Sequence, residues 1–236
     1  MDLQIKLVAA LLPAVVLLIY IIKKDPIPEP TNKLVRAVLC GVGICIPVAF
    51  LEMFIQSWIF GHGGEPTTLF GTTVNAFLVA AVPEEAAKLF VLWLLLRHNP
   101  HFDESFDGVV YAVCVGLGFA AFENVFYVFG QQEGWLMVAI SRALLSVPGH
   151  YGFAILMGYY YSLYHFVDHS AKNAVCIFLM PVLAHGIYDS IAMSNMVNPY
   201  IGMISFCVLV FFCIKLHKVA RNKLQKLMEH DSLNRA

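Results

Sequence analysis

The feature that most limits how this chain can fold is a series of long apolar runs along its length. Hydropathy predicts seven runs, and each is long enough to cross the roughly 30 Å hydrocarbon core of a bilayer as a helix. Only 13% of the residues are charged, whereas a typical soluble domain has about 25%. The sequence therefore predicts an all-α, polytopic membrane protein of about seven spans. The predicted spans are 3–22, 34–58, 68–97, 107–130, 135–166, 174–194 and 200–218.

The domain organisation is predicted to be simple. No long soluble segment, solenoid repeat or low-complexity tract divides the chain, so residues 1–236 form a single integral-membrane domain. Its motif-bearing core covers about 67–194, and a basic, amphipathic tail covers about 218–236. The net charge of −1 favours neither nucleic acid nor a strongly acidic partner, and leaves the lipid bilayer as the predicted surroundings.

The six cysteines all fall inside apolar runs, which argues against a disulfide framework. No CxxC or Cys/His ligand spacing is present, so a thiolate metal site is also not expected.

The basic residues predict the orientation of the chain. All of the 15 lysines and arginines except Lys6, Lys88 and Arg142 lie near the connections after the odd-numbered spans, or after the last span. The positive-inside rule then places the N-terminus outside and the C-terminus in the cytoplasm. The first run is read as a retained span, because its flanking lysines follow it and no small-residue cleavage site is evident.

The third span carries charges near its middle. Glu84 and Glu85 are adjacent there, and Lys88 follows one turn later. A single charge at the centre of a bilayer costs at least ~2.5–3.5 kcal/mol, so such groups are functional by default. Glu84 and Lys88 are spaced i,i+4 and share a helix face, whereas Glu85 points about 100° away from Glu84. A purely structural pairing of these charges is the alternative.

Other spans carry polar residues at similar depth. Glu123 lies in the fourth span, His150 in the fifth and His185 in the sixth, with Asp189 one turn after His185. Counted from the predicted ends, the glutamates and histidines fall at the midplane or in the outer half. We therefore expect them to meet in one hydrophilic cavity that opens toward the outer half of the bilayer. Hydrogen bonding between helices is the alternative role for each of them.

Imidazoles and carboxylates gathered in a low-dielectric site are typical of metal-assisted hydrolysis. They bind Zn²⁺, which lowers the pKa of a bound water, and a second carboxylate takes the proton. No HExxH motif is present, so the site differs from that of soluble zincins. Pro83 and Pro148 lie close to these residues and are expected to kink or split the third and fifth spans.

Four motifs occur in a specific order. They are EExxK at 84–88, FxxxE at 119–123, His150, and HxxxD at 185–189. In this order they resemble the PrsW family of intramembrane proteases, which is similar to the CAAX prenyl endopeptidases and bacteriocin-processing proteases. The resemblance implies an endopeptidase that cleaves a membrane-anchored protein, with anti-sigma factors as the associated substrates. The family is classed as metallopeptidase, and a metal-free, glutamate-activated water has been argued for the superfamily.

We assign roles on this basis. Glu85, or else Glu84, is the expected general base. His150 and His185 are expected to bind the metal or, without one, to hold the oxyanion, and Glu123 is the expected third metal ligand or a second base. The residues expected to support them are Lys88, Asn124, Arg142 and Asp189. A non-catalytic scaffold of the same superfamily and a proton-coupled transporter are the alternatives. The oligomeric state is not predicted.

Overall fold

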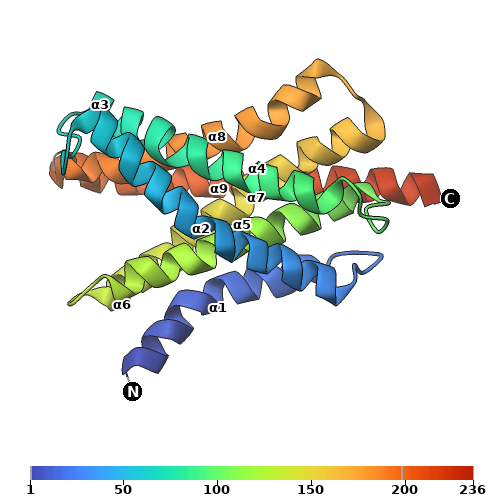
Figure 1. The fold of residues 1–236 in the computed structure, drawn as a ribbon, viewed down its shortest axis with the longest axis horizontal. Coiled ribbons are helices and arrows are strands. Elements are labelled where there is room, and N and C mark those ends of the chain that lie inside the picture. Colours follow the sequence, from blue (N-terminus) through green and yellow to red (C-terminus); the bar gives the residue numbers. More distant parts are fainter. Residues whose placement is uncertain (1, 198, 236) are drawn as a thin grey trace.

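The computed structural model describes residues 2–197 and 199–235, and all regular structure in these ranges is helical. The helices pack into an elongated bundle (Figure 1). This confirms the all-α prediction. In chain order the elements are α1 (Asp2–Ile22), α2 (Thr31–Phe60), α3 (Leu69–Val74), η1 (Asn75–Ala81), α4 (Val82–Leu96), α5 (Ser105–Phe129), α6 (Trp135–Ser141), η2 (Arg142–Ser146), α7 (Val147–Ser162), η3 (Leu163–Val167), α8 (Ala171–Met193), η4 (Ser194–Met196) and α9 (Pro199–Arg235).

These segments join into seven continuous helices within the described ranges, one for each predicted apolar run. Among the described residues, five α-helices are by themselves long and apolar enough to cross a membrane, namely α1, α2, α5, α8 and α9. The other two predicted spans appear as α3–η1–α4 and α6–η2–α7–η3, in which short π-helical segments interrupt the α-helix. The chain is thus a multi-pass membrane protein.

The π-helical segments η1 and η2 end two residues before Pro83 and Pro148, respectively. The N–H of Val82 donates to the carbonyl of Phe77, and that of Val147 donates to the carbonyl of Arg142, each five residues back. A proline has no N–H and crowds the carbonyl four residues earlier, and a widened turn relieves this conflict. The expected kinks are therefore π-turns, and the helices continue through them.

The helix α5 forms the centre of the bundle and is buried along most of its length. A Cβ atom on Gly118 would lie 2.3 Å from the carbonyl oxygen of Val38 on α2, and one on Gly116 would lie 2.8 Å from the Cβ of Ala154 on α7. The two glycines thus allow α2 and α7 to approach α5 closely, as expected from their small size.

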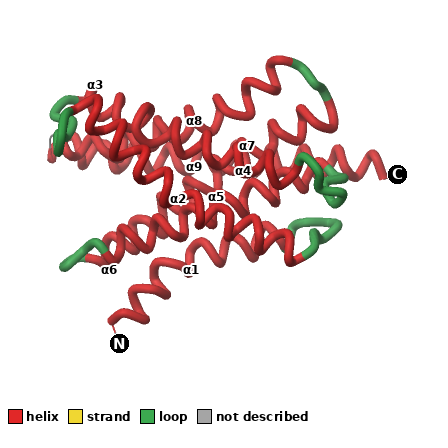
Figure 2. Tube along the Cα trace, viewed as in Figure 1, coloured by secondary structure: helices red, strands yellow, loops and turns green. Residues whose placement is uncertain are grey.

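The loops lie at two opposite ends of the bundle (Figures 1 and 2). Loops 23–30, 97–104 and 168–170 share one end with the C-terminus, and we call this the basic end. Loops 61–68 and 130–134 share the other end with the N-terminus. The alternation predicted from the charges is present in the fold, while the assignment of the basic end to the cytoplasm stays a prediction.

The C-terminal tail continues α9 as one helix to Arg235, well beyond the predicted end of the span at 218. The side chains of Ala220, Leu224 and Leu227 are buried and belong to the main hydrophobic core. The Asp231 carboxylate accepts hydrogen bonds from the backbone N–H groups of Ser105 and Phe106, at the start of α5. The tail is therefore helical, and one of its faces packs against the bundle.

Candidate active site

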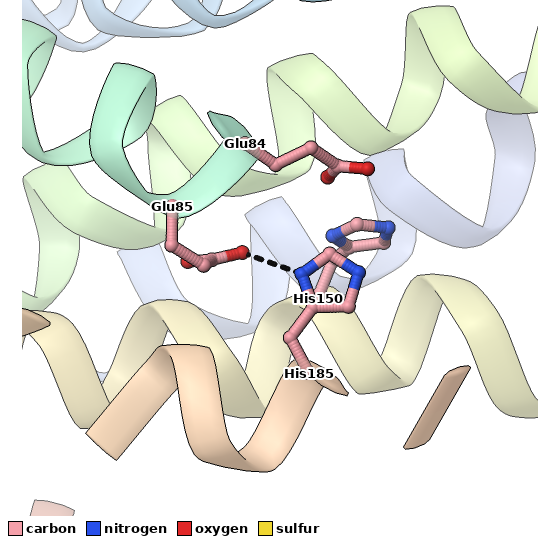
Figure 3. A group of neighbouring side chains, drawn as sticks. All are labelled: Glu84, Glu85, His150 and His185. Carbon is pink, nitrogen blue, oxygen red and sulfur yellow. Dashed lines mark hydrogen bonds and ion pairs between the residues drawn. The ribbon is translucent and has the colours of Figure 1, made fainter. Parts of the chain in front are cut away.

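Four ionisable side chains converge inside the bundle (Figure 3). Glu84 and Glu85 come from the first turn of α4, His150 from the first turn of α7 and His185 from α8. One donor atom of each lies within 4.8 Å of the others, and all four residues are buried. We call this group the Glu–His cluster. Three helices far apart in sequence thus bring these four side chains together, whereas the sequence predicted that a fourth span would add Glu123.

Lys88 supplies a positive charge to the Glu–His cluster. Its Nζ lies 2.8 Å from Glu84 Oε2, 2.8 Å from Glu85 Oε1 and 3.2 Å from His150 Nδ1. The ammonium also lies 4.3 Å from the centre of the Phe119 ring, which places it within cation–π range. Lys88 is only 3% exposed, so this charge is balanced by the two glutamates rather than by water.

Each ring nitrogen of His185 lies within hydrogen-bonding distance of a carboxylate. Nδ1 lies 2.9 Å from Glu85 Oε1, and Nε2 lies 3.2 Å from Asp189 Oδ2 on the next turn of α8. The Phe153 ring stacks on this imidazole, with the ring centres 4.7 Å apart and the planes 17° from parallel. Sequence reasoning missed Phe153, although its position one turn after His150 was a usable signal.

His150 is held in a similar way. Its Nδ1 faces Lys88 and the glutamates, whereas its Nε2 lies 3.0 Å from Glu123 Oε2 on α5. Glu123 in turn pairs with Arg142 Nη2 at 3.0 Å. The Glu123 carboxylate therefore lies on the outer side of His150 and is not a member of the Glu–His cluster.

The polar contacts extend beyond Glu123. The Nε of Arg142 donates to Asn124 Oδ1 at 2.7 Å, and Asn124 Nδ2 donates to the carbonyl of Ala10 on α1. The Arg142 guanidinium also lies 3.9 Å from the centre of the Tyr127 ring. Asn124 and Arg142 thus connect Glu123 to the N-terminal helix.

Glu84, His150 and His185 of the Glu–His cluster line a cavity of about 820 Å³. It reaches Gln56 and Asn195 near the end opposite the basic end. Glu85 does not line it, and that residue is only 1% exposed. Glu52 also borders the cavity. The charged and imidazole side chains that line the cavity are Glu52, Glu65, Glu84, Glu123, Arg142, His150, His185 and Asp189.

Comparison with known proteins identifies the family. The model of the family described as PrsW family intramembrane metalloprotease matches residues 29–215, which include the whole Glu–His cluster. The chain belongs to the PrsW family. This membership makes it a peptidase, rather than the scaffold or the transporter that the sequence alone left as alternatives.

Several relatives are similar along most of their length. A protease PrsW of Clostridioides difficile is 32% identical over 226 residues, which is 94% of this chain and 90% of the relative. A protease PrsW of Bacillus subtilis is 32% identical over 219 residues, with 91% and 94% covered. One from Geobacillus kaustophilus is 36% identical over 183 residues, with 77% and 76% covered. No solved structure matches this chain significantly.

Proposed function

We propose that this PrsW-family protease hydrolyses a peptide bond of a membrane-anchored protein with a water molecule activated by a glutamate of the Glu–His cluster. The observation that carries the proposal is that two glutamates and two histidines are buried together, and that three of these residues line a cavity that reaches one end of the bundle. In such a site a carboxylate can take a proton from water, and nearby cations can stabilise the oxyanion that forms.

Glu84 is the better candidate for the general base. The sequence favoured Glu85, with Glu84 as the alternative. The structure supports the reverse order, because Glu84 lines the cavity whereas Glu85 lies behind it. The Oε1 atom of Glu85 is already hydrogen-bonded to Lys88 and to His185. We assign Glu85 to holding those two side chains in position.

The donors of the Glu–His cluster fit a metal ion of the zinc type, which prefers imidazole nitrogen and carboxylate oxygen. The inner nitrogens, Nδ1 of His150 and Nδ1 of His185, face the glutamate pair, and the outer nitrogens are bonded to Glu123 and Asp189. Metal-binding histidines commonly have such outer carboxylates, which orient the rings.

This geometry gives Glu123 an orienting role, so the donors that would hold the ion are those of the Glu–His cluster. When bound, Zn²⁺ would act as a Lewis acid that lowers the pKa of a bound water. The Lys88 ammonium lies between the same donors, so metal and the protonated lysine would compete for them.

The substrate follows from the depth of the site. The scissile bond must reach a Glu–His cluster that is buried inside a bundle of membrane helices, so the substrate is proposed to be a single-pass protein. Its cleaved segment must be unwound, because the backbone amides of an intact helix are already hydrogen-bonded to one another. An anti-sigma factor is the substrate implied by the resemblance to the family.

Cleavage of a co-reconstituted single-pass anti-sigma factor tests the base assignment. We expect Glu84→Gln to lower the cleavage rate by about 10²–10⁴-fold, because general base catalysis is worth that much. Glu65→Gln, on the same cavity, is the matched control and should cleave normally. Loss of cleavage in Glu85→Gln with cleavage retained in Glu84→Gln would return the role of base to Glu85.

Metal content is measured on the same preparations. If the cluster binds zinc, the purified protein contains about one equivalent, a chelator stops cleavage and added Zn²⁺ restores it. Asp189→Asn should then weaken zinc binding by about 10–100-fold, because it removes an outer carboxylate. Full cleavage by chelator-treated, metal-free protein would instead support a water activated by glutamate alone.

A further inference from the structure

A second cavity, of about 1000 Å³, lies at the basic end and is separate from the active-site cavity. It is a groove between α4 on one side and the end of α7, η3 and α8 on the other. Figure 1 shows α8 turning away from α4 toward this end of the bundle. We call it the α4–α8 groove. It shares no lining residue with the active-site cavity.

The walls of the α4–α8 groove are apolar and rich in aromatic side chains. Phe90 and Trp93 project from α4, Tyr161 from α7, and Ile177 and Phe178 from α8. The groove reaches inward to Ala86, the residue that follows Glu85. A cavity of this kind suits a long hydrocarbon chain that lies along α4.

The mouth of the groove is basic, in contrast to its apolar walls. Arg97, His98 and His165 line it, and no aspartate or glutamate is among the lining residues. The Arg97 guanidinium lies 4.7 Å from the centre of the ring of Trp93, which also lines the groove. Among the described residues Arg97 has no carboxylate partner in an ion pair. An anionic group that reached the mouth would therefore meet an unneutralised cation.

We propose that the α4–α8 groove binds one anionic phospholipid, with its phosphate on Arg97 and an acyl chain extending toward Ala86. Basic pockets between membrane helices on the cytoplasmic side bind anionic head groups in this way. An arginine suits phosphate because its planar, forked donors match two phosphate oxygens.

The charge of the mouth favours a lipid over a helix of the substrate. A single-pass protein carries lysines and arginines on its cytoplasmic flank, and these would be repelled by Arg97 if the basic end faces the cytoplasm. A phosphate is attracted by the same residue. The proposal does not depend on the peptidase chemistry, because it concerns binding at a separate cavity.

Native mass spectrometry of the purified protein tests this site. Phosphatidylglycerol and phosphatidylcholine with the same acyl chains are added in turn, and the fraction of protein that retains one lipid is measured. We expect phosphatidylglycerol to be retained more strongly. Arg97→Gln should weaken its retention by roughly five-fold, because one basic residue at a membrane surface contributes about that factor.

Arg36→Gln is the matched control, since Arg36 is an exposed arginine at the same end of the bundle that does not line the groove. It should retain phosphatidylglycerol like the unmodified protein. Equal retention by Arg97→Gln and Arg36→Gln, or no preference between the two lipids, would overturn the proposal.

A second measurement identifies what lies in the groove. A photo-crosslinking amino acid at position 178 is activated in native membranes that contain the single-pass substrate. The proposal predicts an adduct with the mass of a phospholipid, and a smaller yield of it when Ala174→Trp narrows the groove. An adduct with the substrate protein would assign the groove to a substrate helix and overturn the lipid assignment.

Discussion

The Lys88 side chain balances the charge of the Glu–His cluster. It contacts both glutamates and His150 in a region with almost no exposure to water. Burying one carboxylate without a partner is costly, and here two adjacent carboxylates share a single ammonium group. The lysine of the EExxK motif is thus a requirement for keeping the two glutamates inside the bundle.

Replacing Lys88 tests this requirement. We expect Lys88→Met to destabilise the fold by about 3–5 kcal/mol, because it leaves a buried charge uncompensated. Reversible unfolding in detergent micelles measures the difference. Lys172→Met, at an exposed lysine near the start of α8, is the control and should have little effect. Equal stabilities of the two variants would mean that the glutamates do not need this cation.

At the scale of elements, the π-helical segment η1 sets the direction of the glutamate pair. It precedes Pro83 and changes the rotational phase of α4 relative to α3. If the helix returned to an unbroken α-helix, Glu84 and Glu85 would rotate relative to the residues before them, because each residue of an α-helix turns by about 100°. π-turns are frequent at functional sites, and η2 precedes His150 in the same way.

Pro83→Ala tests the contribution of the π-turn. Alanine restores a backbone donor and permits a regular α-helix, so cleavage should fall while thermal stability is kept or rises. The comparison is with Pro47→Ala, in the interior of α2 and away from the Glu–His cluster, which should leave cleavage unchanged. Unchanged cleavage in Pro83→Ala would show that the orientation of the glutamates does not depend on the proline.

The loop 23–30 between α1 and α2 contains a titratable group outside the membrane-spanning helices. Burial raises the pKa of the Asp25 carboxyl to about 6, although the backbone N–H groups of Glu29 and Ile27 donate to it and lower the value. An unfolded aspartate has a pKa of about 4. The folded state therefore binds this proton more tightly, and its contribution to stability is lost as the pH rises from about 4 through 6.

The pH dependence of unfolding tests this predicted loss of stability. We expect the melting temperature of the unmodified protein, relative to that of Asp25→Asn, to fall between about pH 4 and pH 7. The variant keeps a neutral side chain at every pH and should show the flatter profile. Asp168→Asn, in the exposed loop 168–170, should retain the original slope. Parallel profiles for Asp25→Asn and the unmodified protein would contradict the buried-carboxyl interpretation.

Across the whole molecule, the two cavities open at opposite ends of the bundle. The active-site cavity reaches the end that holds loop 61–68, and the α4–α8 groove opens at the basic end. The charge distribution predicts that the basic end faces the cytoplasm. Substrate would then reach the glutamates from the outer side of the membrane.

Reporter fusions test this orientation in cells. A fluorescent protein that matures only in the cytoplasm should fluoresce when it is fused to the C-terminus and should stay dark at the N-terminus. A periplasmic phosphatase should show the opposite pattern at the same two positions. Fluorescence at the N-terminus alone would reverse the orientation and place the active-site cavity on the cytoplasmic side.

The helices and the identity of the buried polar groups could be predicted from the amino-acid sequence alone. Seven apolar runs had to become helices, because backbone groups in hydrocarbon must be hydrogen-bonded within the chain. The charged residues inside those runs were identifiable as a site, because their desolvation cost depends mainly on depth. The ordered motifs from Glu84 to Asp189 added the family, which the comparisons confirmed.

How those groups face one another depends on the packing of the helices and could not be predicted from the sequence. This packing puts Glu84 on the cavity wall and Glu85 behind it, and it sets Glu123 on the outer side of His150. The π-turns before Pro83 and Pro148 could not be read from a regular α-helical spacing. The direction of a side chain depends on the phase and crossing of its helix, and packing between segments distant in the sequence sets both.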